Sequence, residues 1–297
     1  MFDRILIPLD GSQLSESILA PVGRILRRED AEVELLQVVP ARADTWAWGE
    51  ESASAHEPDG LRDHLSAVAE RLSSEGVTVH SRVVRGEPAA AILDRVEAWR
   101  PSLVAMTTHG RGGLGRIIRG SVAERVLRRC SAPLLLASPA AAKAEGEPRF
   151  RKVLVPLDPS STAAAILPLV REVARLYEAE IVLCRVWPLW EGYPSLREAA
   201  RAQHDHPDER TADLTGVRDE LEEAGIRTRV RLDAGDPATR LLEAIEAEGA
   251  DLVAMSTHGF GGATRWLLGS VAEKVLRAAS VPVLLRRAQA AGQEVKE

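Results

Sequence analysis

THGRGGLGRIIRGSVAE, residues 108–124, recurs in the same chain as THGFGGATRWLLGSVAE, residues 257–273. Between residues 108–136 and 257–285, 18 of 29 aligned positions are identical by direct count. Two other stretches repeat at nearly the same offset: RILIPLDGS at 4–12 returns as KVLVPLDPS at 152–160, and GEPAAAIL at 86–93 returns as GDPATRLL at 235–242. A repeat this long indicates two homologous domains rather than the units of a solenoid.

The domain organisation follows from this duplication. The chain has 297 residues, about twice the length of a typical domain. We predict a first domain at 1–138, a linker at 139–149, a second domain at 150–287 and a flexible C-terminal tail at 288–297. The linker is placed at SPAAAKAEGEPR, residues 138–149, because this stretch has few large apolar side chains.

The order of strands and helices predicts the fold class. In the first half, short apolar runs at 4–9, 33–39, 77–84, 103–108 and 133–137 alternate with helical patterns at 13–28, 59–74, 88–99 and 121–129. Apolar strands that alternate with helices indicate an α/β fold with a parallel sheet, covered on both faces and connected by right-handed crossovers. In such open sheets, ligands bind beyond the carboxyl ends of the strands, where the strand order reverses.

The repeated glycine-rich turn follows the fourth strand of each half. Its glycines lack a β-carbon, so the backbone can adopt positive φ and a ligand can approach the amides closely. Gly120-Ser121 and Gly269-Ser270 then begin a helix, whose amino-terminal amides form a site suited to phosphate. In the alternative interpretation, SVAE is a capping box in which the serine and glutamate side chains satisfy those amides. The two roles are compatible, because a capping box uses only some of the amides.

Two familiar nucleotide motifs are excluded. No G-x-x-x-x-G-K-[ST] sequence occurs, so a Walker-type NTPase has no support. Gly110, Gly112 and Gly115 match G-x-G-x-x-G, but the turn follows the fourth strand rather than the first, and Thr264 replaces the third glycine in the second copy. A dinucleotide fold is therefore not favoured.

The composition limits the classes of binding partner and the cellular compartment that we expect. The net charge of −6 and the pI near 5.8 leave no overall basic field for nucleic acid or an anionic membrane surface. The amino-terminal sequence MFDRILIPLD has no signal-peptide pattern, and two cysteines cannot form a disulfide framework. We expect a cytoplasmic protein in which Cys130 and Cys184 are buried as small apolar residues rather than reactive thiols.

The turn and its surroundings resemble those of a tandem universal stress protein, with two such domains in one chain. The resemblance covers nearly all of both halves and rests on the nucleotide signature of the family, G-x2-G-x9-G-[ST]. Its second and third glycines are matched by Gly110 and Gly120 in one half and by Gly259 and Gly269 in the other. Pro8-Leu9-Asp10, Pro156-Leu157-Asp158 and the G-x-P turns at Gly86 and Gly235 add support.

The resemblance implies a five-stranded parallel sheet of order 3-2-1-4-5 in each half, with the halves packed as an internal pseudo-dimer through their last strands. A homodimer and unidentified protein clients are further expectations. It also implies ATP, or ATP with Mg²⁺, as the ligand. Asp10 and Asp158 would contact the ribose, and the backbone of Val38 and Val186 the adenine. The remaining implied binding residues are Pro8, Met106, Thr107, Gly110, Gly113, Gly120, Ser121, Val122, Pro156, Met255, Ser256, Gly259, Gly262, Gly269, Ser270 and Val271.

The chain departs from this signature at its first glycine, which is Thr107 in one half and Ser256 in the other. If the position requires positive φ or an unobstructed backbone, Thr107 hinders binding and Ser256 hinders it less. If the position only supplies an amide, the hydroxyl can add a hydrogen bond to phosphate. Arg111, Arg116 and Arg119 surround the first turn, where the second copy has Phe260, Arg265 and Leu268. We therefore expect tighter phosphate binding in the first half, unless these arginines belong to a solvated helix face.

No catalytic constellation is recognisable. His109 and His258 adjoin the turns, but no nucleophile and orienting group accompany them in both halves. Asp10 and Asp158 have alternative roles in binding a metal beside a triphosphate or in capping the first helix. HDHPDE at 204–209 is metal-like but does not recur. The tryptophans that follow the second strands either cover the adenine or pack the loop; they are Trp46, Trp48, Trp187 and Trp190.

Three functions are compatible with these features. The leading hypothesis is a stress-response protein that binds ATP or a related adenine nucleotide as a regulatory ligand, with slow turnover or none. The alternative is an interaction module that has lost nucleotide binding and acts through protein partners. An adenylate-transferring enzyme on a related fold would need catalytic groups that the sequence does not show.

Overall fold

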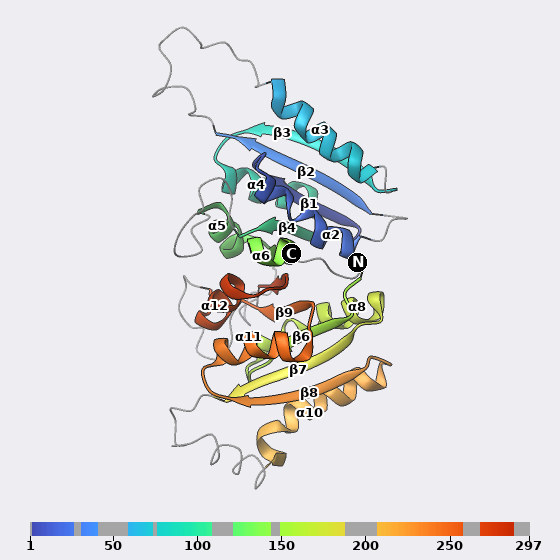
Figure 1. Cartoon of the computed structure of the whole chain (residues 1–297), viewed down its shortest axis with the longest axis vertical. Helices are drawn as coiled ribbons and strands as arrows, with labels where there is room; N and C mark the ends of the chain where they lie inside the picture. Colours follow the sequence, from blue (N-terminus) through green and yellow to red (C-terminus); the bar gives the residue numbers. More distant parts are fainter. Residues whose placement is uncertain are drawn as a thin grey trace, which may run out of the picture. The chain divides into compact units, whose positions relative to one another are not determined.

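The computed structural model of the chain describes residues 2–26, 31–40, 59–73, 76–108, 121–143, 149–187, 207–257 and 268–287. The chain divides into two compact units, Met1–Lys143 and Ala144–Glu297. Each unit contains a parallel β-sheet with helices packed against it (Figure 1). The predicted α/β class is confirmed. The domain and linker boundaries proposed from the sequence stay predictions.

The first unit has a sheet of order β3-β2-β1-β4-β5 in its described residues. The strands are β1 (Arg4–Leu9), β2 (Glu32–Val39), β3 (Thr78–Arg85), β4 (Leu103–Thr107) and β5 (Leu134–Ala137). The helices are α1 (Gln13–Glu16), α2 (Leu19–Ile25), α3 (Asp59–Ser73), α4 (Pro88–Trp99), α5 (Ser121–Arg129) and α6 (Pro139–Lys143). The order reverses between β1 and β4, as a five-stranded 3-2-1-4-5 sheet requires.

The second unit repeats this topology with the order β8-β7-β6-β9-β10. Its strands are β6 (Lys152–Pro156), β7 (Glu180–Trp187), β8 (Thr228–Ala234), β9 (Leu252–Ser256) and β10 (Val283–Arg286). Its described helices are α7 (Ser161–Ala164), α8 (Leu167–Tyr177), α10 (Pro207–Glu223), α11 (Pro237–Glu248) and α12 (Ser270–Ala278). Here the order reverses between β6 and β9.

The central strands explain why each sheet lies in the core. Every residue of β4 and of β9 is buried, although successive side chains of a strand point to opposite faces. Both faces of the sheet are therefore covered, as the continuous apolar runs LVAMT and LVAMS predict. The outer strand β3, in contrast, has mostly exposed or half-buried residues.

The first helical segment differs from the sequence prediction of one helix over residues 13–28. It consists of α1 and α2, separated at Ser17 and Ile18, and α2 ends at Ile25. Pro21 lacks the amide that would donate to the carbonyl of Ser17, so the helix is interrupted there. The second unit shows the same break between α7 and α8, where Pro168 lacks the corresponding amide.

A short helix, α6, begins inside the predicted linker. Its first turn is capped by Ser138, whose hydroxyl accepts a 3.1 Å hydrogen bond from the amide of Ala141. Pro139 at the first helical position fits this start, because its missing amide would have no partner there. Ala141 and Ala142 are buried, so small alanines here serve packing rather than flexibility.

Candidate functional site

The predicted binding residues that the structure describes lie at the carboxyl edge of each sheet, at the reversal of strand order. In the first unit Ile5 pairs with Leu103, so that Leu9, four residues further, is level with Thr107. In the second unit Val153 pairs with Leu252, which brings Leu157 level with Ser256. Asp10 and Asp158 therefore leave the sheet beside the strands that carry the glycine-rich turns.

The two aspartates are held by serines in the same way. The carboxylate oxygen Oδ1 of Asp10 accepts hydrogen bonds of 2.9 Å from the amide of Ser12 and 2.6 Å from its hydroxyl. In the second unit, Asp158 Oδ1 accepts from the amide of Ser160 at 2.9 Å and from its hydroxyl. Each carboxylate is thereby held at the strand end through its Oδ1 atom.

These contacts correct the interpretation of the aspartates as helix caps. The N-cap residues of α1 and α7 are Ser12 and Ser160, whose side chains accept from the amides of Ser15 and Ala163 at 3.1 Å. The aspartates orient the capping serines instead. The local signal for this arrangement is the D-x-S sequence, in which the serine rather than the aspartate is the cap.

The fourth strands end in buried polar residues. Thr107 and Ser256, which replace the first signature glycine, are 6% and 5% exposed, and Met106 and Met255 before them are also buried. The hydroxyl of Ser256 donates a 3.1 Å hydrogen bond to the carbonyl of Ala163 in α7. Its proton is directed to the protein here, and the alternative in which this hydroxyl donates to phosphate stays a prediction.

The amino terminus of α12 lies directly beside the end of β9. Gly269 is the N-cap residue, and its amide donates a 2.9 Å hydrogen bond to the carbonyl of Thr257. The amide of Thr257 in turn donates to the carbonyl of Arg286 at 3.1 Å. The two ends of the second glycine-rich turn are thus joined, although the amide of Gly269 is engaged by the protein.

The capping-box interpretation is wrong for the second unit. Ser270 is the first residue of α12 rather than its N-cap, and no side chain caps the helix within the described chain. Glu273 forms an ion pair with Arg277 at 2.8 Å instead of reaching back to the amino terminus. The helix itself has no acceptors for its first-turn amides, so those of Ser270 and Val271 are suited to an anion.

In the first unit α5 also begins at the predicted serine, Ser121, with Val122 in its first turn. Its Glu124 forms an ion pair with Arg128. The rest of the predicted phosphate site falls outside the described residues. This applies to Gly110, Gly113, Gly120, Gly259 and Gly262, to His109 and His258, and to Arg111, Arg116, Arg119, Phe260 and Arg265.

The residues predicted to contact adenine lie at the ends of the second strands. Val38 and Val186 are half-buried, and by register they are level with Asp10 and Asp158. Trp187 ends β7, and the guanidinium of Arg185 lies 5.8 Å from its ring centroid. This contact favours a packing role for Trp187. Trp46, Trp48 and Trp190 lie outside the described residues.

Polar residues that the sequence analysis missed lie just below this edge. Arg185 is a charged residue in the otherwise apolar run of β7, and its side chain is 3% exposed. It binds Asp213 of α10 through both terminal nitrogens at 2.7 Å. A single arginine within a buried strand was the available signal, because such a charge must be paired.

The G-x-P turns follow the third strand of each unit and lie at the same carboxyl edge of the sheet. Gly86 and Gly235 have φ of 155° and 141°, the conformation that favours glycine. The following residues, Glu87 and Asp236, cap α4 and α11 through their carboxylates. Hydrogen bonds from Thr239 lower the pKa of Asp236, so this cap is charged at neutral pH.

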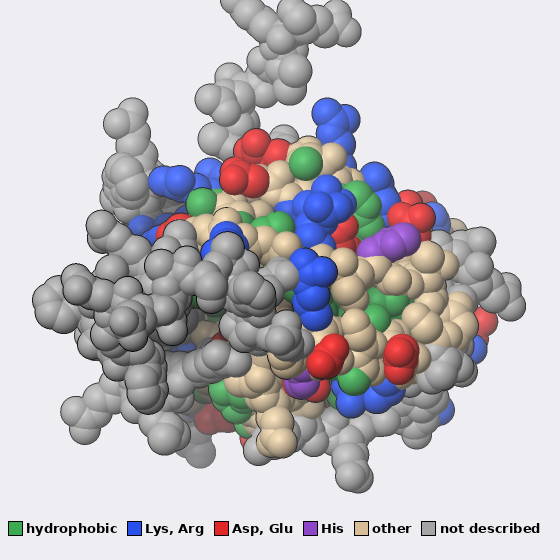
Figure 2. All heavy atoms as spheres, turned by 90° about the horizontal axis from the view of Figure 1, so that it is seen from above, with side chains coloured by type: hydrophobic (Ala, Val, Ile, Leu, Met, Phe, Trp, Pro, Cys, Tyr) green, Lys and Arg blue, Asp and Glu red, His purple; other side chains and the backbone are tan. Residues whose placement is uncertain are grey.

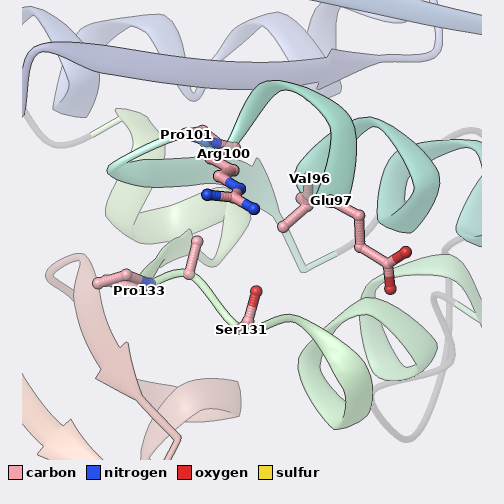
Figure 3. A pocket seen from close by; sticks show the side chains of 7 residues that line it. Val96, Glu97, Arg100, Pro101, Ser131 and Pro133 are labelled. Carbon is pink, nitrogen blue, oxygen red and sulfur yellow. The ribbon is translucent and has the colours of Figure 1, made fainter. Parts of the chain in front are cut away.

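A separate hollow of about 500 Å³ lies at the amino-terminal edge of the first sheet (Figure 3). Its wall includes Arg100, which has φ of 51° where the second unit has Gly249. The full lining is Val96, Glu97, Arg100, Pro101, Ser131, Ala132 and Pro133. Because these residues precede β4 and β5, the hollow is at the opposite edge from the candidate site.

Charged side chains of both signs lie together on one face of the first unit (Figure 2). Figure 2 shows basic, acidic and histidine side chains interspersed on the face formed by α3 and β3. Across the described ranges, no group of three or more His, Cys, Asp or Glu residues is placed to hold a metal. In the same ranges no helix has the length and apolar character needed to cross a membrane. HDHPDE begins at His204, outside the described residues.

The fold and this edge define a doubly wound α/β protein with a candidate ligand site where the strand order reverses. The family model described as "Universal stress protein family" matches residues 1–138 and 149–287. The chain therefore belongs to the universal stress protein family and carries its domain twice.

Relatives with both domains support the tandem arrangement. A universal stress protein of Mycolicibacterium smegmatis is 26% identical over 300 residues, covering 95% of this chain and 96% of the relative. One of Mycobacterium tuberculosis H37Rv is 26% identical over 298 residues, with the same coverage. The crystal structure of a universal stress protein from Archaeoglobus fulgidus DSM 4304 aligns with a TM-score of 0.74 at 23% identity. The alignment covers 97% of this chain and 100% of the Archaeoglobus chain, and it shows that the two share a fold.

Proposed function

We propose that the protein binds ATP or a related adenine nucleotide in each unit, as a regulatory ligand in a cytoplasmic stress response. Turnover is slow or absent. The observation that carries the proposal is that two groups lie at the ends of neighbouring strands. One is a carboxylate held by a serine, and the other is the amino terminus of a helix that no side chain caps. In the second unit these are Asp158, held by Ser160, and the amino terminus of α12.

The chemistry of the two groups fits the two ends of a nucleotide. A carboxylate accepts hydrogen bonds from ribose hydroxyls, and the first-turn amides of a helix donate to phosphate oxygens. The G-x9-G-[ST] spacing brings the turn back to the same strand end, and the contact between Gly269 and Thr257 closes it. The pairing of the two units and any homodimer stay predictions from the sequence.

Calorimetric titration with ATP, with and without Mg²⁺, tests this proposal. We expect two sites in the wild type, one in Gly120→Val, one in Gly269→Val and none in the double variant. Gly216→Val is the matched control, because a β-carbon at this helical glycine meets nothing within 4 Å and lies far in sequence from both turns. If the control also loses ATP binding, the loss in the other variants reflects reduced stability rather than a role of the turns.

One observation favours the second candidate function, an interaction module without nucleotide. Ser256 stands at the position of the first signature glycine, and its hydroxyl is hydrogen-bonded to the carbonyl of Ala163. A side chain therefore lies at a strand end where the family signature has none. In that case the wild type shows no heat and no thermal stabilisation at millimolar ATP. Protein partners are then the ligands to seek.

A further inference from the structure

Arg185 fixes the backbone immediately before Asp158. Its Nε donates a 3.0 Å hydrogen bond to the carbonyl of Leu157, and its two terminal nitrogens each donate to Asp213 at 2.7 Å. The amide of Leu157 donates to the carbonyl of Cys184 at 2.9 Å. Both backbone polar groups of Leu157 are therefore bound to β7. We call the contacts of Arg185 with Leu157 and Asp213 the Arg185 clamp.

The clamp is well placed to control the adjacent carboxylate. Asp158 follows Leu157 directly, and its Oδ1 is held by Ser160 at the start of α7. The side chain of Arg185 is 3% exposed, so its hydrogen bond to the carbonyl of Leu157 is made in a poorly solvated environment, whereas the side chain of its partner Asp213 is half exposed. The hydrogen bonds from Arg185 also lower the pKa of Asp213, which keeps the pair charged at neutral pH. A series of hydrogen bonds thus runs from Asp213 of α10 through Arg185 of β7 to Leu157, the residue before Asp158.

The first unit has a different arrangement at the equivalent positions. The offset of 148 places Gln37 at the position of Arg185, and the offset of 149 places His64 at that of Asp213. Gln37 is 3% exposed, and its Oε1 has no hydrogen-bond partner among the described residues. His64 Nε2 instead lies 2.7 Å from Glu16 in α1. The backbone before Asp10 consequently has no counterpart of the Arg185 clamp within the described structure.

We propose that Arg185 is a positioning residue that presets Asp158 for the ribose of a nucleotide, a role that Gln37 does not fill in the first unit. This inference rests on the proposed nucleotide function. A carboxylate that is already oriented loses less conformational freedom when it binds, so its hydrogen bond contributes more to affinity. The second unit therefore discriminates the ribose more strongly than the first.

Ribose discrimination in the second unit tests the proposal. In a Gly120→Val chain, which retains one site, the dissociation constants of ATP, 2′-deoxy-ATP and 3′-deoxy-ATP are measured by calorimetry. We expect at least one deoxy analogue to bind about tenfold more weakly than ATP, the effect of one lost hydrogen bond to a charged group. Asp158→Ala should abolish this ratio, and Arg185→Gln should reduce it to about twofold. Arg185→Lys, which can reach only one of the two partners, should give an intermediate ratio.

Arg229→Gln is the matched control, because Arg229 also forms ion pairs in the second unit but is bound to Glu180 and Glu248 away from Asp158. It should lower the melting temperature without changing the ribose ratio. A purely structural Arg185 would behave like this control, and that result overturns the proposal. Equal affinities of the three nucleotides in the Gly120→Val chain also overturn it. Failure of the proposed function differs from both, because the wild type would then bind no ATP.

Discussion

The hydroxyl of Ser256 at the end of β9 donates a 3.1 Å hydrogen bond to the carbonyl of Ala163 in α7. A residue that replaces a glycine of the family signature thus joins the fourth strand of the unit to its first helix. The contact is buried and connects residues 93 positions apart. It gives the substitution a role in the fold that does not depend on a ligand.

Ser256→Ala should therefore reduce stability without reducing nucleotide affinity. The loss of one buried hydrogen bond, with an acceptor left unpaired, costs about 1–3 kcal/mol. Urea unfolding and ATP titration of the same samples measure both quantities. Ser256→Gly should lose the same hydrogen bond and restore the signature glycine. An affinity loss of about fivefold or more in Ser256→Ala would contradict the prediction, because it would require a contact between the hydroxyl and the nucleotide.

Arg95→Met should destabilise the first unit strongly. Glu34 in β2 is 2% exposed and accepts hydrogen bonds of 2.6 and 2.5 Å from Arg95 of α4. Removing one partner of a buried ion pair leaves its charge poorly compensated and costs at most about 3–5 kcal/mol. The remaining arginine, Arg82, lies 3.1 Å from Glu34 but is half exposed, and so compensates in part.

Urea unfolding of three variants separates this effect from general loss of charge. Glu34→Leu/Arg95→Met should be more stable than Arg95→Met alone, because no unpaired carboxylate remains. Arg128→Met is the surface control: its pair with Glu124 lies on exposed positions of α5, where the cost is at most about 1 kcal/mol. Equal losses for Arg95→Met and Arg128→Met would mean that the buried pair has no special energetic role.

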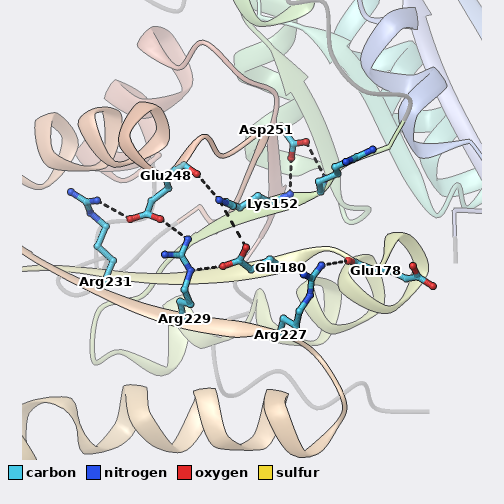
Figure 4. Close-up of polar contacts among 9 residues, drawn as sticks. Lys152, Glu178, Glu180, Arg227, Arg229, Arg231, Glu248 and Asp251 are labelled. Carbon is cyan, nitrogen blue, oxygen red and sulfur yellow. Dashed lines mark hydrogen bonds and ion pairs between the residues drawn. The ribbon is translucent and has the colours of Figure 1, made fainter.

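The ion pairs of Glu248 should make the second unit sensitive to acid (Figure 4). Hydrogen bonds from Arg231, together with the charge of Arg229, hold the pKa of Glu248 below its ordinary value. A carboxylate with a lowered pKa in the folded state contributes stability above its unfolded pKa, and this stability is lost as the pH falls through the folded pKa. We expect the loss below about pH 4.5, the usual range of a glutamate.

Glu248→Gln should flatten this pH dependence. Hydrogen exchange of β7 and β8 amides, compared between about pH 6 and pH 3.5, reports on the unit directly. Glu243→Gln serves as the control, since Glu243 is on the same helix but half exposed in its pair with Arg240. Parallel pH profiles for the wild type and Glu248→Gln would show that this network does not govern acid stability.

Both thiols should be unreactive in the folded protein. Burial raises the pKa of Cys130 to about 11 and that of Cys184 to about 12. Both side chains are buried and reduced, which agrees with the expectation of small apolar residues. A disulfide reagent at about pH 8 should label neither cysteine before unfolding and both in guanidinium chloride, because the thiolate is the reactive form. Rapid labelling of the native protein would contradict this assignment.

Much of the fold and part of the site are predictable from the sequence. The repeat, the apolar runs and the position of Asp10 after β1 follow from local patterns of period and spacing. The break between α1 and α2 also had a local signal, Pro21, but an otherwise continuous helical pattern concealed it. The alternative interpretations of Ser270 and Asp10 as caps are wrong because a cap depends on the dihedral angles at the helix start, which short motifs do not specify.

The sequence by itself determined the duplicated α/β architecture and the strand ends that form the candidate site. These features depend on side-chain periodicity and on residues close in the chain. Only the tertiary structure decided how Ser256 and Arg185 are used. Their partners, Ala163 of α7 and Asp213 of α10, are 93 and 28 residues away and lie on helices beside the strands that carry Ser256 and Arg185. Two homologous units can therefore share one fold and one signature while differing in the polar contacts beneath their sites.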